Sequence, residues 1–117
     1  MSEHLETEAV PRPGELTVET ARVEGGSVVS VRGELDISSA PAFKQALEGS
    51  RASDTCTVVV DLAELVFIDS TGLRALLAAK QRAAAGGGDL RIRNARAQVR
   101  RLLEIAGVLE LLSAERD

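Results

Sequence analysis

The 117-residue sequence predicts an α/β fold, a small mixed sheet of four or five strands covered by helices. Two observations carry this prediction. The chain opens with two strand-like segments joined at Gly25-Gly26, which is typical of an antiparallel hairpin because glycine adopts the positive φ angles of tight turns. Each later apolar strand follows a helical segment, which is typical of parallel strands connected by crossovers. The expected order is β-β-α-β-α-β-α.

The two hairpin strands differ in their apolar pattern. Leu16 and Val18 alternate with polar residues, as expected of a half-buried strand. The second strand, around Val28 to Val31, is more uniformly apolar, so we expect it to be more central. The segment "ISSAPAFKQALEGS" then predicts a helix, and Ser38 or Ser39 is its expected cap because a hydroxyl oxygen can accept from free helix amides.

The middle of the chain predicts a buried strand followed by a helix. The segment "TVVVDLAELV" is interpreted as a strand and an apolar turn. Its three consecutive valines, Val58 to Val60, are typical of a parallel strand covered on both faces. The following helix is apolar at Leu73, Leu76 and Leu77, and we expect it to end at the triple glycine after residue 85.

The last part of the chain predicts an edge strand and an amphipathic helix. The strand "DLRIRN" places Leu90 and Ile92 inward and Arg91 and Arg93 outward. The helix in "RAQVRRLLEIAGV" should end at Gly107, and "LELL" is expected to be a short strand or a turn. The apolar face of this helix consists of Val99, Leu102, Leu103 and Ala106.

Composition excludes several classes of function. The chain has two Phe and neither Trp nor Tyr, so few aromatic rings could stack on nucleic-acid bases. Its formal net charge of −4 does not attract nucleic acid or an anionic membrane. The single cysteine, Cys56, excludes an intrachain disulfide and a cysteine metal cluster, and we expect no metal or other cofactor. No segment is typical of a signal peptide or a membrane span, so we expect a cytoplasmic protein.

The domain organisation is expected to be simple. Residues 1–14 are acidic, carry two prolines and show no periodicity, so we interpret them as a flexible tail. The only histidine, His4, lies there and is interpreted as incidental. Residues 15–117 are expected to form one folded domain.

A polar loop interrupts the apolar pattern at "FIDSTGL", residues 67–73. Helix capping explains Asp69 and a hydroxyl beside it. Gly72 is not needed for a cap and costs about 1 kcal/mol relative to alanine, which indicates a close approach to the backbone. A phosphate on Ser70 would be tolerated at a helix N-terminus and would add a charge of roughly −1.5 to −2. The loop is therefore either a cap alone or a modification site.

A second polar loop, "GELDISSA", follows the preceding strand. If the two strands are neighbours, Asp36 and Ser70 share one edge of the sheet, where functional loops gather. A hydrolase is excluded, because Ile68 stands where a nucleophile elbow has its first glycine and the folded part has no histidine base. A phosphate-binding loop is excluded by the lack of its glycine-lysine motif.

Two stretches, "VRGELDISSAPAFKQAL" and "VVVDLAELVFIDSTGLRALLAA", closely resemble the STAS-domain anti-sigma factor antagonists of bacteria. The resemblance runs from about Leu16 to Leu112 and implies a STAS-like fold. It also implies a non-enzymatic switch in transcription: the unphosphorylated antagonist binds a cognate anti-sigma factor, which is an ATP-dependent serine kinase, and frees the sigma factor. Phosphorylation by that kinase inactivates the antagonist, and a metal-dependent serine phosphatase restores it.

The resemblance assigns roles to individual residues. The phosphorylation site it implies is Ser70, the serine directly after the motif aspartate, and Thr71 is a less suitable acceptor. A phosphate beside Asp69 would add repulsion and a desolvation cost to a docked interface, and Arg74, one turn into the helix, would partly neutralise it. The implied partner-binding residues are Asp36, Asp69, Ser70, Thr71, Gly72 and Arg74.

Alternatives remain open from the sequence. A STAS subunit of a lipid-transport or stress-sensing assembly would use the same fold as a contact, without cycling the hydroxyl. A phosphorelay receiver would use Asp61 or Asp69 as acceptor, but the opening hairpin and the helical positions of Lys44 and Lys80 disfavour it. We expect a monomer or weak dimer. A cluster of arginines is interpreted as a solvated face first and a partner contact second: Arg91, Arg93, Arg96, Arg100 and Arg101.

Overall fold

A computed structural model describes residues 15–50 and 56–113 of the chain. The expected tail, residues 1–14 with His4, lies outside the described residues. The predicted order of elements is confirmed, and one more helical turn follows it. In chain order the elements are β1 (Leu16–Val23), β2 (Gly26–Leu35), α1 (Ala40–Ser50), β3 (Thr57–Ile68), α2 (Ser70–Ala85), β4 (Asp89–Arg93), α3 (Ala97–Ile105) and α4 (Leu109–Leu112).

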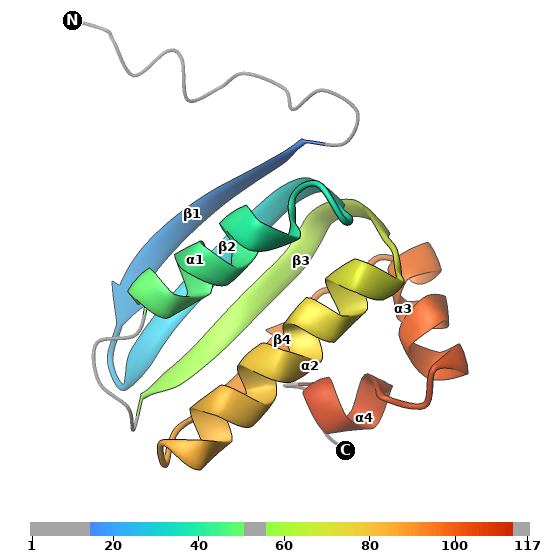
Figure 1. The fold of residues 1–117 in the computed structure, drawn as a ribbon. Helices are drawn as coiled ribbons and strands as arrows, with labels where there is room; N and C mark the ends of the chain where they lie inside the picture. Colours follow the sequence, from blue (N-terminus) through green and yellow to red (C-terminus); the bar gives the residue numbers. More distant parts are fainter. Residues whose placement is uncertain (1–14, 51–55, 114–117) are drawn as a thin grey trace, which may run out of the picture.

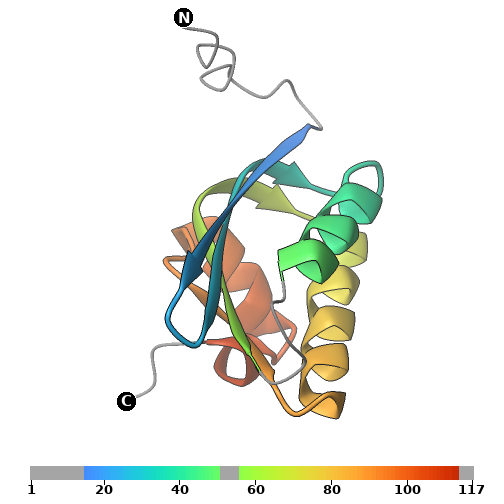
Figure 2. The same ribbon diagram turned by 90° about the vertical axis from the view of Figure 1, so that its left-hand side faces the viewer.

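Within the described residues, the strands form one mixed four-stranded sheet in the order β1-β2-β3-β4 (Figure 1). β1 and β2 pair antiparallel, whereas β2-β3 and β3-β4 pair in parallel. This confirms the mixed sheet, the internal position of β2 and the edge position of β4. α1 and α2 lie together over one face of the sheet (Figure 2), while α3 contacts β3 and α4 contacts β4.

The hydrophobic core lies between the sheet and its helices, and it includes Val99 and Leu103 of α3 and Leu112 of α4 beside the residues of α1 and α2. Val58 and Val60 of β3 are buried in it, as are Leu90 and Ile92 of β4, so the inward residues of β4 are confirmed. Val59 is only half-buried, because alternate side chains of a strand point to opposite faces and α1 and α2 cover one of them. The predicted cover of the valine run on both faces is therefore complete at Val58 and Val60 and only partial at Val59.

The hairpin turn lies one residue before its predicted position. The turn residues are Glu24 and Gly25, and Gly25 has the positive φ of +85°. Gly26 is already the first residue of β2 and pairs with Val23. A Cβ atom on Gly26 would lie 1.7 Å from the carbonyl oxygen of Thr57. This glycine is therefore required by the close approach of β3, and not by the turn.

β3 continues through the segment that the sequence predicted to be an apolar turn. The strand runs without a break from Thr57 to Ile68 and ends directly at the polar loop. Its pairing with β2 is irregular and shifts register at two places. Such bulges change which side chains face the core. As a result Leu65 and Ile68 are buried, whereas Val66 and Phe67 between them are exposed.

The C-terminal elements partly follow the prediction. α3 buries Val99 and Leu103, and Gly107 ends it with a φ of +78°. Ala106 was expected on the buried face, but it is exposed because it already lies at the C-cap. The segment "LELL" is the short helix α4, whereas a strand or a non-helical turn was expected. It buries Leu112 in the core.

Candidate functional site

The two polar loops meet at the carboxyl ends of β2 and β3. Leu35 and Ile68, the last residues of these strands, are register partners. The backbone amide of Asp69 donates to the carbonyl oxygen of Leu35 at 3.2 Å. In Figure 1 the β2-α1 connection and the start of α2 accordingly lie at the same end of the sheet. The expected neighbourhood of Asp36 and Ser70 is therefore confirmed.

Asp69 alone caps helix α2. Its Oδ1 atom accepts from the backbone amide of Gly72 at 2.9 Å, and its carbonyl oxygen accepts from the amide of Leu73 at 2.9 Å. Ser70 is the first residue of the helix and is exposed. Its hydroxyl makes no hydrogen bond within the part of the chain that the structure describes. Capping therefore accounts for the aspartate and leaves the serine hydroxyl available, whereas Thr71 is half-buried.

Gly72 is explained by packing inside the chain. A Cβ atom at this position would lie 2.5 Å from the carbonyl oxygen of Leu35 and 2.8 Å from its Cγ atom. It would also lie 3.0 Å from a side-chain carbon of Ile68. The close approach predicted from the sequence is thus real, and the approaching group is the end of β2. Gly72 lets α2 begin directly against the two strand ends and so fixes the position of Ser70.

The neighbouring loop is held by Asp36. Its Oδ1 atom accepts from the amide and the hydroxyl of Ser38 at 3.0 and 2.8 Å, and from the amide of Ser39 at 3.1 Å. The hydroxyl of Ser39 donates to the carbonyl oxygen of Glu34 at 2.8 Å and accepts from the amide of Asp36 at 3.0 Å. The hydroxyls of both serines thus hold the turn around Asp36. Ser39 directly precedes α1, and its carbonyl oxygen accepts from the amide of Phe43 at 3.1 Å.

The electrostatics of this loop favour an ionised aspartate. The hydrogen bond from the Ser38 hydroxyl lowers the pKa of Asp36 most. Partial desolvation raises the pKa, but the amides of Ser38 and Ser39 lower it further, and the net result lies below the ordinary value. Asp36 therefore presents a negative charge near Ser70 at neutral pH.

The arginines separate into engaged and available side chains. Arg91 pairs with Asp89, Arg93 with Asp61 and Arg100 with Glu104, while Arg96 donates to the carbonyl oxygen of Ala63 at 2.8 Å. These four therefore do not form a free basic patch. Arg74 is exposed and forms no ion pair with any of the described residues.

Sequence analysis missed apolar residues at this edge. Ile37 is 72% exposed in the turn after β2, and Phe67 is 46% exposed near the end of β3. A signal was present for Ile37, because it stands between Asp36 and two serines in a segment that cannot bury it. Phe67 gave no such signal, because its exposure follows from the register shifts of β3.

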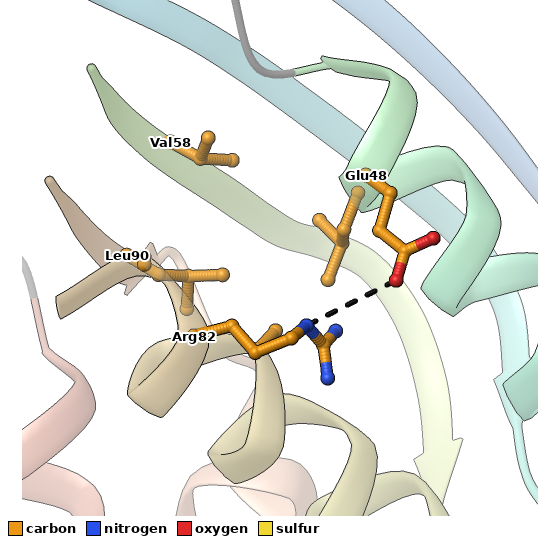
Figure 3. Close-up of a pocket in the computed structure, with 7 residues that line it drawn as sticks. Glu48, Val58, Arg82 and Leu90 are labelled. Atoms are coloured by element: carbon orange, nitrogen blue, oxygen red, sulfur yellow. Dashed lines mark ion pairs between the residues drawn. The ribbon is translucent and has the colours of Figure 1, made fainter. Parts of the chain in front are cut away.

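A small pocket lies away from this edge (Figure 3). The ion pair between Arg82 and Glu48, at 3.9 Å, lies beside Val58 and Leu90 in that view. Val58 and Leu90 are the second residues of β3 and β4, so the pocket lies at the opposite end of the strands from Ser70. The pocket has room for about one water molecule and is not part of the candidate site.

Two further classes of site were tested in the described residues. No group of three or more His, Cys, Asp or Glu side chains within residues 15–50 and 56–113 is arranged to hold a metal ion. In the same ranges, no helix combines the length and the apolar character needed to cross a membrane.

Comparison with known proteins identifies the family. The family model described as "Mlab, STAS domain" matches residues 18–113. The chain belongs to the STAS domain family. Its four-stranded sheet, opening hairpin and βα repeats are thus the STAS fold. The phosphorelay receiver considered above is contradicted, because this sheet opens with an antiparallel pair and Lys44 and Lys80 both lie in helices.

STAS relatives of this chain include named anti-sigma factor antagonists. RsfB of Mycobacterium tuberculosis, an anti-sigma-F factor antagonist, is 33% identical over 70 residues, which are 60% of this chain and 57% of that protein. An anti-sigma factor antagonist from Mycobacterium paratuberculosis has a crystal structure with a TM-score of 0.73 and 30% identity, covering 88% of this chain and 87% of that one. The match to RsfB therefore spans little more than half of that relative.

The fold also matches Bacillus SpoIIAA, whose structure is known in a phosphorylated form. The TM-score is 0.63 at 18% identity, and the match covers 88% of this chain and 92% of SpoIIAA. At this identity the likeness establishes the common fold of the two STAS domains.

Proposed function

We propose that the chain is an anti-sigma factor antagonist controlled by phosphorylation of Ser70. In its unphosphorylated form it binds a cognate anti-sigma factor, which is also a serine kinase, and releases the sigma factor. The observation that carries the proposal is the division of roles at the start of α2: Asp69 makes the cap, and Ser70 keeps an exposed hydroxyl with no structural task in the described residues. The names of the relatives support the same function.

A phosphate on Ser70 would change the interface without unfolding the domain. The cap bond from Gly72 to Asp69 does not involve the serine hydroxyl, so it can persist after modification. The phosphate would bring roughly −1.5 to −2 charges next to Asp69 and close to the ionised Asp36. A partner surface that accepts two carboxylates would then have to desolvate a third and stronger anion, which weakens docking.

Arg74 lies on the same side of the helix as Ser70, because residues four apart on a helix are neighbours. It can pair with the phosphate and offset part of its charge. Arg74 thus reduces the loss of binding that the phosphate causes. A serine phosphatase that removes the phosphate restores binding. We include Asp36, Asp69, Ser70, Thr71, Gly72 and Arg74 in the proposed contact surface.

The regulatory relatives are binding proteins, and we propose that this chain likewise acts in the cytoplasm without catalysing a reaction. We further propose that residues 15–117 form the interacting domain. A second candidate is an assembly subunit in which the same surface makes a permanent contact. The matching family model describes a STAS domain, which both candidates would use. The two candidates differ in whether Ser70 is phosphorylated by a partner.

Phosphate mapping tests the proposal. The purified chain is incubated with its candidate anti-sigma kinase and Mg-ATP, and modification is located by mass spectrometry. Ser70→Ala is the test variant and Ser30→Ala the matched control, because Ser30 is an exposed serine of β2 away from the strand ends. We expect one phosphate on Ser70 that disappears only in Ser70→Ala. Tight binding without phosphate would support the assembly subunit, and neither binding nor phosphate would contradict both candidates.

A further inference from the structure

Large apolar side chains are exposed close to the paired ends of β2 and β3. Ile37 follows β2 by two residues, and Phe67 is the last but one residue of β3. The chain has two phenylalanines, and the other, Phe43, is fully buried. Exposed isoleucine and phenylalanine give up the free energy that burial would contribute, roughly 1.5 to 3 kcal/mol for each side chain. A bound partner that covers these side chains would recover that free energy.

The turn around Ile37 is rigid. Asp36 accepts four hydrogen bonds on one oxygen, and Ser39 ties the turn back to the carbonyl oxygen of Glu34. These bonds hold the backbone on both sides of Ile37. A side chain presented by a fixed backbone loses little conformational entropy when it binds, which is typical of residues that dominate binding energy.

Phe67 and Ile37 lie near the paired ends of β3 and β2. Phe67 is the register partner of Glu34, and the next pair in the ladder is Leu35 with Ile68. Ile37 therefore extends from one of two paired strands, and Ser70 extends from the other by the same two residues. The three positions occupy one continuous edge of the sheet.

The charges at this edge define the chemistry of the partner. Asp36 and Asp69 carry carboxylates at this edge, and Glu34 adds a third near the end of β2. Arg74 is the one cation among the residues assigned to the contact surface, so the edge stays acidic on balance. A complementary surface therefore has an apolar recess bordered by basic side chains. A second copy of this acidic edge would bring like charges together and is disfavoured.

We propose that Ile37 and Phe67 are the apolar anchors by which this chain docks on the anti-sigma kinase, in a recess with a basic border. The inference rests on the proposed function and gives a reason for the effect of one phosphate. The Ser70 loop leaves the same edge of the sheet, so a phosphate there must be desolvated when a partner covers this edge. The same geometry brings the hydroxyl to the kinase.

The test truncates each proposed anchor to alanine, with an equally exposed isoleucine as the control for Ile37. Ile37→Ala and Phe67→Ala are measured against Ile105→Ala, because Ile105 is also 72% exposed but lies at the end of α3. The probe is the anti-sigma kinase that binds the wild-type chain, and titration calorimetry gives each Kd. We expect Ile37→Ala and Phe67→Ala to weaken binding about tenfold or more, and Ile105→Ala to change it less than about twofold.

The outcomes separate the two proposals. Circular dichroism and thermal melting should show that all three variants fold like the wild type, because each side chain is exposed. If the wild type binds the kinase and both edge variants bind equally well, the anchors are wrong and the proposed function stands. If the wild type neither binds nor is phosphorylated, the function fails and the anchors fail with it. If Ile37→Ala instead abolishes a dimer of the free chain in ultracentrifugation, a second copy is the occupant and the inference is overturned.

Discussion

Gly72→Ala is predicted to destabilise the protein, although alanine is the better helix former. The added Cβ atom would lie 2.5 Å from the carbonyl oxygen of Leu35, against 3.4 Å or more for an ordinary contact. Leu35 is fully buried, and the same oxygen accepts the amide of Asp69 at 3.2 Å. The strand end therefore cannot retreat without loosening this hydrogen bond, and α2 must shift instead.

The magnitude follows from opposing contributions. Overpacking of this kind costs roughly 1 to 3 kcal/mol, and weakening the Leu35 to Asp69 hydrogen bond adds about 1 kcal/mol. The higher helix propensity of alanine relative to glycine offsets at most about 1 kcal/mol of this destabilisation. We therefore expect Gly72→Ala to lower the free energy of unfolding by about 1 to 3 kcal/mol. Urea denaturation followed by circular dichroism measures this value.

Gly49→Ala is the matched control. Gly49 lies in α1, and a Cβ atom built there meets nothing within 4 Å. Only the propensity contribution applies, so this variant should be more stable than the wild type by about 0.5 to 1 kcal/mol. The two glycine substitutions should thus have opposite signs. If Gly72→Ala were as stable as the wild type or more stable, the packing explanation of Gly72 would be wrong.

Three further predictions concern the cap, the charges and the phosphate. Asp69→Ala should lower the free energy of unfolding by about 1 kcal/mol in urea denaturation and Asp69→Asn by much less, because only an asparagine oxygen can still accept the Gly72 amide. Desolvation raises the pKa of Asp89, but hydrogen bonds from Lys80 and Arg91 outweigh it and lower the pKa to about 2. Because the pKa is lower in the folded state, Asp89 stabilises the fold by about 2 kcal/mol above pH 4, and this contribution is lost as the pH falls toward 2. In acid unfolding, Lys80→Met should lose less stability than the wild type over this range. An unchanged pH profile would contradict the pairing. On the Ser70-phosphorylated protein, Arg74→Ala should raise the pKa of the phosphate in a ³¹P NMR titration, because the neighbouring cation favours the dianion; an unchanged pKa would show that Arg74 does not contact it.

The order of elements could be predicted because local patterns determine it. Alternation at Leu90 and Ile92 and the triple glycine after α2 each depend on neighbouring residues, and the structure agrees with both. The juxtaposition of Asp36 and Ser70 could also be predicted, because parallel neighbours place their following loops at one edge.

The errors lie where distant segments decide the local structure. Gly26 is needed because Thr57 approaches its backbone, and no local pattern contains that contact. At Gly72 the close approach was predicted from the sequence, but not that Leu35 makes it. β3 continues beyond its expected end because β2 supplies a partner for residues up to Ile68. Each of these features depends on the pairing of strands that are far apart in the sequence.

The exposed apolar side chains could not be predicted for the same reason. The register shifts between β2 and β3 turn Phe67 away from the core, although its sequence context is that of a buried strand. The role of Asp69 as the only cap was also undecided, because either Asp69 or Ser70 fits that pattern. The hydrogen bond from Gly72 distinguishes them.

The central claim is that a phosphate on Ser70 prevents docking on the anti-sigma kinase. The most direct measurement is the Kd of that kinase for the chain carrying phosphoserine at position 70, compared with the unmodified chain. A chain with phosphoserine at position 30 is the control, because Ser30 is exposed on β2 away from the strand ends. The account predicts binding at least about tenfold weaker for phosphoserine 70 and nearly unchanged binding for phosphoserine 30. Equal binding of the unmodified and the Ser70-phosphorylated chain would contradict it.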